Sequence, residues 1–169
     1  MRTYVKIFIF ILILTLGLIS LYSCATAPYT GRQQILLISE GEEMSLGENA
    51  YRDVLKKEKI SQDPKANNLV KRVGTRVAAV ANKPGYRWEF TVIDNPKTVN
   101  AFCLPGGKIA VYTGILPYTQ TEAGLAFVMA HEIGHAIAHH GGERMSEQYI
   151  AKLGQEAINI AIAGKSPAP

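Results

Sequence analysis

The chain has 169 residues, of which 47% are apolar, and it carries 18 Lys and Arg against 14 Asp and Glu. Two of the bases and none of the acids lie in the first 23 residues, so without that segment the net charge falls from +4 to +2. A nearly neutral chain with no basic cluster longer than a pair excludes nucleic-acid binding as its main function. The remaining length is enough for one globular domain with its own core.

The N-terminal segment is predicted to be a lipoprotein signal peptide. Two basic residues precede an apolar run at 7–21, which is too short to span a bilayer comfortably. The sequence Leu21-Tyr22-Ser23-Cys24 resembles the lipobox of bacterial lipoproteins, where cleavage occurs before a lipidated cysteine. We therefore expect 1–23 to be removed and Cys24 to carry the lipid anchor. An uncleaved membrane helix is the alternative, and both interpretations place the rest of the chain outside the cytoplasm.

The two cysteines and their surroundings give further expectations about location and folding. If Cys24 is lipidated, Cys103 is the only remaining thiol, so the fold must hold without an intrachain disulfide. Ala25 stands where some bacterial lipoproteins have the Asp that retains them at the inner membrane. We expect a chain anchored to a membrane of the cell envelope and facing the periplasm, with the outer membrane slightly favoured.

The mature chain is predicted to form a tether, at 24–38, and one α+β domain, at 39–169. A capping box of Ser39 and Glu42 begins a helix that runs to about Lys59. The other predicted elements are a helix at 64–81, a strand at 86–94, short strands at 99–104 and 108–112 joined by a Pro-Gly-Gly turn, and helices at 121–140 and 143–163 separated by Gly141-Gly142. This order predicts helices packed on a small antiparallel sheet.

The histidines point to metal chemistry, because all four lie between positions 131 and 140. His131 and His135 are four residues apart, on one face of a helix, where both can bind one zinc ion. Glu132 is rotated by about 100°, so its carboxylate lies beside the metal and can take a proton from an activated water. The apolar flanks predict a mostly buried helix, in which unpartnered polar groups are costly. A metal site therefore explains these three residues better than a chance pair of surface histidines.

The other two histidines are predicted to lie outside the metal site. His139 is eight residues from His131, about 12 Å along a helix axis, which is too far for both to bind the same ion. Ala138 and Gly141 exclude the metzincin pattern, which has Gly and His at these positions. We expect His139 and His140 to be ordinary residues of the helix end, where the helix dipole favours them.

Several motifs in this order resemble one family of zinc peptidases. They are Asn100-Ala101-Phe102-Cys103-Leu104-Pro105-Gly106-Gly107-Lys108-Ile109, Val111-Tyr112-Thr113-Gly114, His131-Glu132-Ile133-Gly134-His135 and Glu143-Arg144-Met145-Ser146. The sequence is similar to the gluzincin family of CAAX prenyl endopeptidases, the protease HtpX and Oma-type peptidases, and most similar to its bacterial periplasmic lipoprotein branch. The resemblance covers about 30–161. It implies a zincin-like fold with a long active-site helix, one zinc ion on His131 and His135, and Glu132 as the general base.

The resemblance also implies a substrate site and a role. The strand of Lys108, Ile109, Ala110, Val111 and Tyr112 would form the edge of the cleft and pair with an extended peptide. The implied function is that of a zinc endopeptidase in quality control of the cell envelope. Its partners would be unfolded or unassembled envelope proteins, and the membrane that holds Cys24.

One departure from the family concerns the third zinc ligand. The family takes it from a later Glu in a Glu-x-x-x-Asp pattern, which this sequence lacks, although catalytic zinc sites have three protein ligands. Glu156 could supply it if the last two helices pack antiparallel; otherwise we expect the C-terminal part of the domain to be missing. The alternative function is a non-catalytic envelope lipoprotein that binds peptides or proteins through the same groove, or an inactive fragment of the peptidase.

Overall fold

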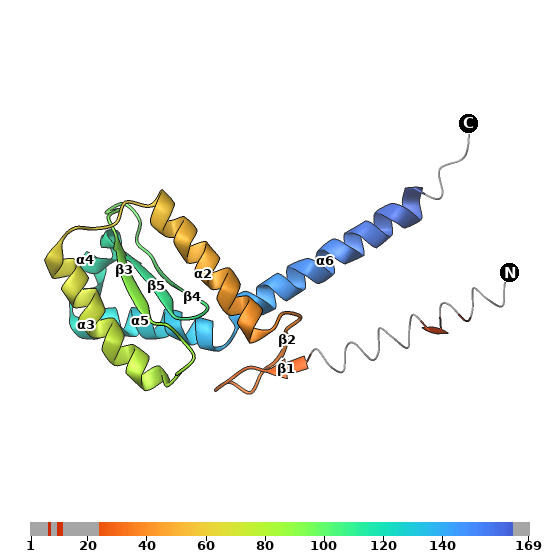
Figure 1. Cartoon of the computed structure of the whole chain (residues 1–169), viewed down its shortest axis with the longest axis horizontal. Coiled ribbons are helices and arrows are strands. Elements are labelled where there is room, and N and C mark those ends of the chain that lie inside the picture. The colour runs from red at the N-terminus through yellow and green to blue at the C-terminus, as the bar shows by residue number, and fades with distance from the viewer. Residues whose placement is uncertain (1–6, 8–9, 12–23, 164–169) are drawn as a thin grey trace. The chain divides into compact units, whose positions relative to one another are not determined.

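The computed structural model describes residues 24–163 together with residues 7, 10 and 11 (Figure 1). Apart from those three residues, the predicted signal peptide at 1–23 lies outside the described residues, and its role remains a prediction. Within the described ranges, no helix is both long and apolar enough to cross a membrane. The chain divides into two compact units, one of Ile38–Gly141 and one of Met1–Leu37 with Gly142–Pro169.

A three-stranded sheet forms the centre of the unit Ile38–Gly141. Its strands are β3 (Glu89–Ile93), β4 (Ala101–Leu104) and β5 (Lys108–Tyr112), in the order β3-β5-β4. β5 runs parallel to β3 and antiparallel to β4. The predicted α+β class is confirmed, but the sheet is mixed and not antiparallel. The reason is that the turn after β4 reverses the chain, so that β5 returns antiparallel to β4 and lies between β4 and β3, parallel to β3.

Two helices precede the sheet, and local signals set where they begin. α2 (Glu40–Lys57) follows the predicted capping box, in which Ser39 Oγ accepts the Glu42 N–H (3.2 Å) and the Glu42 carboxylate accepts the Ser39 N–H (2.8 Å). α3 (Pro64–Ala81) has the predicted bounds and is capped by the side chain of Asp63. It ends at Asn82, which adopts a left-handed conformation (φ 46°) that asparagine tolerates.

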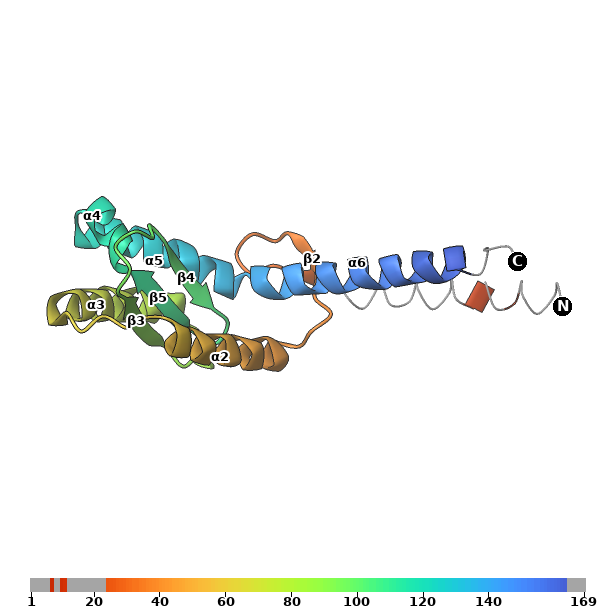
Figure 2. The same cartoon turned by 90° about the horizontal axis from the view of Figure 1, so that it is seen from above.

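The helices cover both faces of the sheet, with α2 and α5 on opposite sides of it in Figure 2. On the α2 side, the hydroxyls of Tyr51 and Thr91 are 2.5 Å apart. On the other side, α3 approaches closely at Gly74, where a Cβ would lie 2.4 Å from the Phe90 ring. The buried core is on that side and consists of residues from α3, the sheet and α5: Val70, Val73, Val92, Ile109, Val111, Leu125, Met129, Ile133 and Ile137.

Of the two long helices after the sheet, the first ends earlier than predicted and the second begins earlier than predicted. A short 3-10 turn, η1 (Thr113–Ile115), and α4 (Leu116–Thr119) lead to α5 (Glu122–Ile137) and α6 (His140–Ala163). The predicted helix at 121–140 is therefore too long, because His139 adopts a left-handed conformation (φ 57°) that interrupts it. Gly141 and Gly142 lie inside α6 and do not cap α5.

The segment predicted to be a tether is folded in part. β1 (Cys24–Thr26) and β2 (Gln33–Ile35) form an antiparallel hairpin within the unit Met1–Leu37 with Gly142–Pro169. Each strand has three residues, which is too short for an alternating pattern to appear in the sequence.

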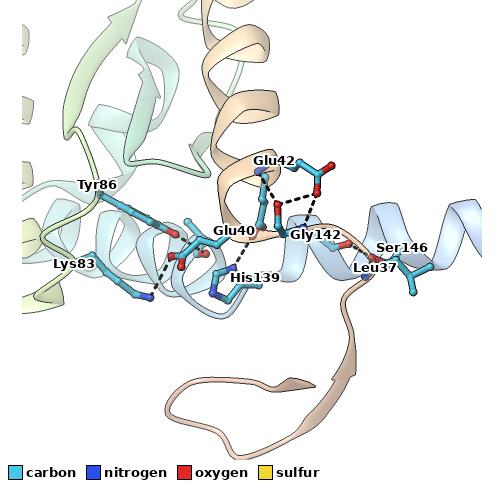
Figure 3. A network of polar contacts seen from close by, with 11 residues as sticks. Leu37, Glu40, Glu42, Lys83, Tyr86, His139, Gly142 and Ser146 are labelled. Atoms are coloured by element: carbon cyan, nitrogen blue, oxygen red, sulfur yellow. Dashed lines mark hydrogen bonds and ion pairs between the residues drawn. The ribbon is translucent and has the colours of Figure 1, made fainter. Parts of the chain in front are cut away.

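Polar contacts join this hairpin segment to α6 within the same unit. The guanidinium of Arg32 donates two hydrogen bonds to the carboxylate of Glu143 (2.5 and 2.7 Å). The N–H of Leu37 donates to Ser146 Oγ (2.9 Å), and this hydroxyl, whose residue is 1% exposed, donates to the Gly142 carbonyl (2.8 Å; Figure 3).

Candidate metal centre

The His-Glu-x-x-His residues lie together on α5. The Nε2 atoms of His131 and His135 are 3.0 Å apart, and the two rings meet edge to face with their centroids 4.5 Å apart. Both histidines are exposed, and Glu132 between them is half-buried. The structure thus brings two imidazole nitrogens together on the exposed face of the helix, and Glu132 follows the first of them in the sequence.

The burial of α5 differs from the prediction. Leu125, Met129 and Ile133 form a buried stripe, but Phe127, one of the apolar residues that flank the motif, is 76% exposed. The helix is therefore amphipathic, and its histidines lie on the open face. Because the histidines are exposed, the cost of burying unpartnered polar groups does not apply to them. The support for a metal site comes instead from the two histidine nitrogens that face each other.

Two contacts fix α5 to the rest of its unit. The buried Tyr86 hydroxyl donates a hydrogen bond to the Ala136 carbonyl (3.2 Å), one turn beyond Glu132. Burial raises the pKa of Tyr86, and the negative charge of Glu43 adds to this effect, so the phenol stays protonated and remains a donor. At the start of the helix, Glu122 forms an ion pair with Arg72 of α3.

The end of α5 is fixed by an ion pair that the sequence did not predict. His139 Nδ1 lies 2.6 Å from Glu43 Oε2 on α2, and the two side chains are 12% and 4% exposed. Figure 3 shows His139 turned toward the start of α2. The hydrogen bond to Glu43 raises the pKa of His139, although burial opposes it. This contact, and not the helix dipole, accounts for the place of His139.

The ion pair is expected to stabilise the fold in a pH-dependent way. Because the folded-state pKa of His139 is raised above its ordinary value of 6.5, its contribution is complete below that value and is lost as pH rises through the folded-state pKa. In a double-mutant cycle of Glu43→Gln and His139→Asn, we expect a coupling free energy of about 2 kcal/mol at about pH 6, and a smaller one at about pH 9. Urea unfolding of the wild type and the three variants measures this coupling free energy. Asparagine is chosen at position 139 because it tolerates the left-handed backbone conformation. A coupling that is the same at both pH values would contradict the assignment.

His140 also differs from its predicted role, because it contacts a histidine of the motif. Its Nδ1 lies 2.6 Å from Nδ1 of His135, and the ring centroids are 4.9 Å apart. On an unbroken helix, a residue five positions later points about 140° away. The interruption at Ala138 and His139 brings His140 back to His135. Since neither of those residues is a usual helix terminator, the sequence carried no signal for this contact.

Two candidate metal donors, His131 and His135, lie together in the part of the chain that the structure describes. Among the residues that the structure describes, no group of three His, Cys, Asp or Glu side chains is placed to hold a metal ion. Glu156, the alternative third ligand, is an exposed residue of α6 and belongs to no such group.

Comparison with known proteins assigns the family. The profile of peptidase family M48 matches residues 64–166, which include all the residues of the motif. The chain belongs to peptidase family M48. The mitochondrial metalloendopeptidase OMA1 of Schizosaccharomyces pombe is 37% identical to it over 70% of this chain and 36% of the relative. The beta-barrel assembly-enhancing protease of Escherichia coli K12 is 30% identical over 75% of this chain and 26% of the relative. The matches thus cover about a quarter to a third of these relatives.

In this M48 chain, the strand that was predicted to bind the substrate lies in the middle of the sheet and not at its edge. β5 lies between β3 and β4, so both of its backbone edges are already paired and it cannot accept a peptide. Ile109, Ala110 and Val111 are fully buried. Tyr112, the last residue of β5, lies opposite Ile93 of β3. The prediction that 108–112 forms the edge of the cleft is therefore wrong.

Lys108 is a buried link between the sheet and α2. Its ammonium, 3% exposed, lies 3.2 Å from Glu48 Oε2, donates to the Arg87 carbonyl (3.1 Å), and pairs with Glu89. Burial lowers the pKa of Lys108, but the hydrogen bonds to Glu89 and Glu48 outweigh it, so the pKa is raised and the amine stays charged. Its side chain serves the packing of α2 and not the site on α5.

The M48 sheet has two edge strands, β3 and β4. The outer side of β3 is bridged by residues 59–61, where the Ser61 N–H donates to the Val92 carbonyl (2.8 Å) and the Asp94 N–H donates to the Lys59 carbonyl (2.7 Å).

The other edge belongs to β4. The Tyr112 N–H donates to the Asn100 carbonyl (3.1 Å), so by the alternation of an antiparallel pair the main-chain groups of Ala101 and Cys103 point away from β5. In the described ranges no strand pairs with that side of β4. Burial, and then the nearby Glu132 carboxylate, raises the pKa of the Cys103 thiol to about 12. Because β4 contacts α5, the helix that bears the motif, this edge lies beside the motif.

Proposed function

We propose that this chain is the metal-binding part of a zinc endopeptidase, in which His131 and His135 hold the ion. The observation that carries the proposal is the pair of Nε2 atoms that face one another on α5, 3.0 Å apart. Two imidazole nitrogens fit two of the positions around a zinc ion. When bound, zinc polarises the scissile carbonyl and lowers the pKa of water.

The residues of the chain then account for the transfer of protons. Glu132 is adjacent to the first histidine, and its half-buried carboxylate is an acceptor for a proton of the attacking water. The same group can give that proton to the leaving amine as the peptide bond breaks. Family membership supports this assignment, because the relatives named above are called metalloendopeptidase and protease.

We propose the outer edge of β4, in place of β5, as the position of the substrate backbone. The N–H and C=O groups of Ala101 and Cys103 point to this side of β4, where strand addition would pair them, and Glu132 lies close to Cys103. A polypeptide bound as an added strand would slow amide hydrogen exchange at these two residues but not at Ile109, which is already paired. Equal exchange with and without an unfolded polypeptide would contradict this placement.

The cellular setting is part of the same proposal. The substrates would be unfolded or unassembled proteins of the cell envelope, and Cys24 would anchor the chain to the membrane that faces the periplasm. The predicted lipobox supports the anchor. Mass spectrometry of the mature N-terminus tests it, since an unmodified or uncleaved Cys24 would exclude it.

Removal of the metal tests the enzymatic proposal on the full chain. We expect the purified chain to hold about one zinc ion, to hydrolyse an unfolded polypeptide, to lose this activity on chelation and to regain it with added Zn²⁺. A chain that binds no zinc, or that hydrolyses equally well after chelation, would instead favour a non-catalytic protein that binds peptides at the same place.

A further inference from the structure

The two ring nitrogens of His135 face different partners. Nε2 faces Nε2 of His131 at 3.0 Å, and Nδ1 faces Nδ1 of His140 at 2.6 Å. The His135 ring therefore lies between two imidazoles: that of His131, the other candidate ligand, and that of His140.

The protonation of His135 follows from this arrangement and from elementary imidazole chemistry. A neutral imidazole has one N–H and one bare nitrogen, and only the bare nitrogen can bind a cation. If Nε2 of His135 is to bind a metal, its proton must be on Nδ1. That proton then points at Nδ1 of His140, which must accept it, so His140 carries its own proton on Nε2.

We propose that His140 is a positioning residue, which holds His135 in the Nδ1–H tautomer and fixes its ring so that Nε2 is available to a divalent cation. The proposal rests on the proposed metal site. Metal-binding histidines commonly donate their second N–H to an acceptor that sets their orientation and basicity. His140 does not complete the ligand set, because its Nδ1 faces the ring nitrogen of His135 that lies away from His131.

The fold places His140 by means of contacts on either side of the turn that precedes it. The left-handed His139 turns the chain between α5 and α6, and its ion pair with Glu43 fixes that turn. The Tyr86 hydroxyl holds the Ala136 carbonyl just before it. These two contacts come from different elements, α2 and the segment before β3, so the place of His140 depends on residues far from it in the sequence.

The tautomer can be measured directly in the metal-free chain. In full-length protein with ¹⁵N-labelled histidine, at about pH 8 where neutral imidazoles dominate, two-bond ¹H–¹⁵N correlations should show His135 as the Nδ1–H form. His140→Leu and His140→Gln lack an acceptor at the place of Nδ1, and we expect His135 to change largely to the Nε2–H form. His140→Asn has an amide oxygen near that place and should restore the wild-type pattern.

Zinc affinity gives a second readout on the same variants. In competition with a chromophoric chelator, His140→Leu and His140→Gln should bind Zn²⁺ about 10- to 100-fold more weakly than the wild type. His140→Asn should lie closer to the wild type. Glu147→Gln is the control, since it changes an exposed residue of the same helix away from His135 and His140, and circular dichroism shows which variants fold. Because Gln is polar and close in size to His, it keeps the test informative if Leu prevents folding.

The outcomes separate this proposal from the proposed function. An unchanged His135 tautomer in folded His140→Gln or His140→Leu would overturn the positioning role, whatever the zinc affinity. If His135 changes tautomer as expected but no variant binds zinc, the role of His140 stands and the metal-dependent function fails.

Discussion

Glu132→Gln is expected to lower the hydrolysis of an unfolded polypeptide by about 10²- to 10⁴-fold, the usual contribution of a general base. The amide has nearly the shape of the carboxylate but cannot accept the proton of the attacking water. Glu132 lies next to His131 in the sequence but is not one of the two residues whose nitrogens face each other, so the variant should still bind Zn²⁺. Steady-state hydrolysis and metal content, measured on the same preparation, check both parts.

A matched control for this substitution is Glu147→Gln, at an exposed position of α6. It makes the same chemical change away from the motif and should leave hydrolysis unchanged. If Glu132→Gln kept wild-type activity with zinc bound, Glu132 would not be the base. If it lost the zinc as well, the carboxylate would have to be counted among the ligands.

Gly47→Ala is expected to lower the free energy of unfolding by about 2 kcal/mol, since overpacking at so close a contact costs about 3 kcal/mol. A Cβ at this position of α2 would lie 2.3 Å from the carbonyl oxygen of Pro105, in the turn between β4 and β5. The obstacle is backbone, so it cannot rotate away. The higher helix propensity of alanine, about 1 kcal/mol, offsets only part of this cost. Urea unfolding followed by circular dichroism measures the difference.

Gly41→Ala is the matched control on the same helix. No heavy atom lies within 4 Å of the Cβ that it would add, so the variant should be as stable as the wild type or slightly more stable. Equal stability of the two variants would mean that α2 does not pack against the Pro105 turn as closely as the structure shows.

Features with local causes could be predicted from the sequence. The capping box of Ser39 and Glu42 has the expected hydrogen bonds, and α3 has the expected bounds, because a cap and a first-turn proline act within one helical turn. The motif histidines lie on one face of α5 for the same reason, since helical spacing alone sets their separation.

Features that depend on distant partners could not be predicted. The turn at His139 is fixed by Glu43, which is 96 residues away, and without that turn His140 would not meet His135. The pairing of β5 with both β3 and β4 joins strands that are not all neighbours in the chain, whereas the strand sequences alone also suit a simple antiparallel sheet. For this reason the substrate edge was assigned to the wrong strand.

The strand order has a consequence for the synthesis of the chain. β3 and β4 are made before β5, but each of them pairs only with β5 in this sheet and not with the other. A nascent chain that has not reached Tyr112 therefore contains two strands without their partner, and the sheet can form only once its last strand has left the ribosome. α5 begins ten residues after the end of β5. The helix that bears the histidines is therefore synthesised directly after the sheet that it packs against becomes able to form.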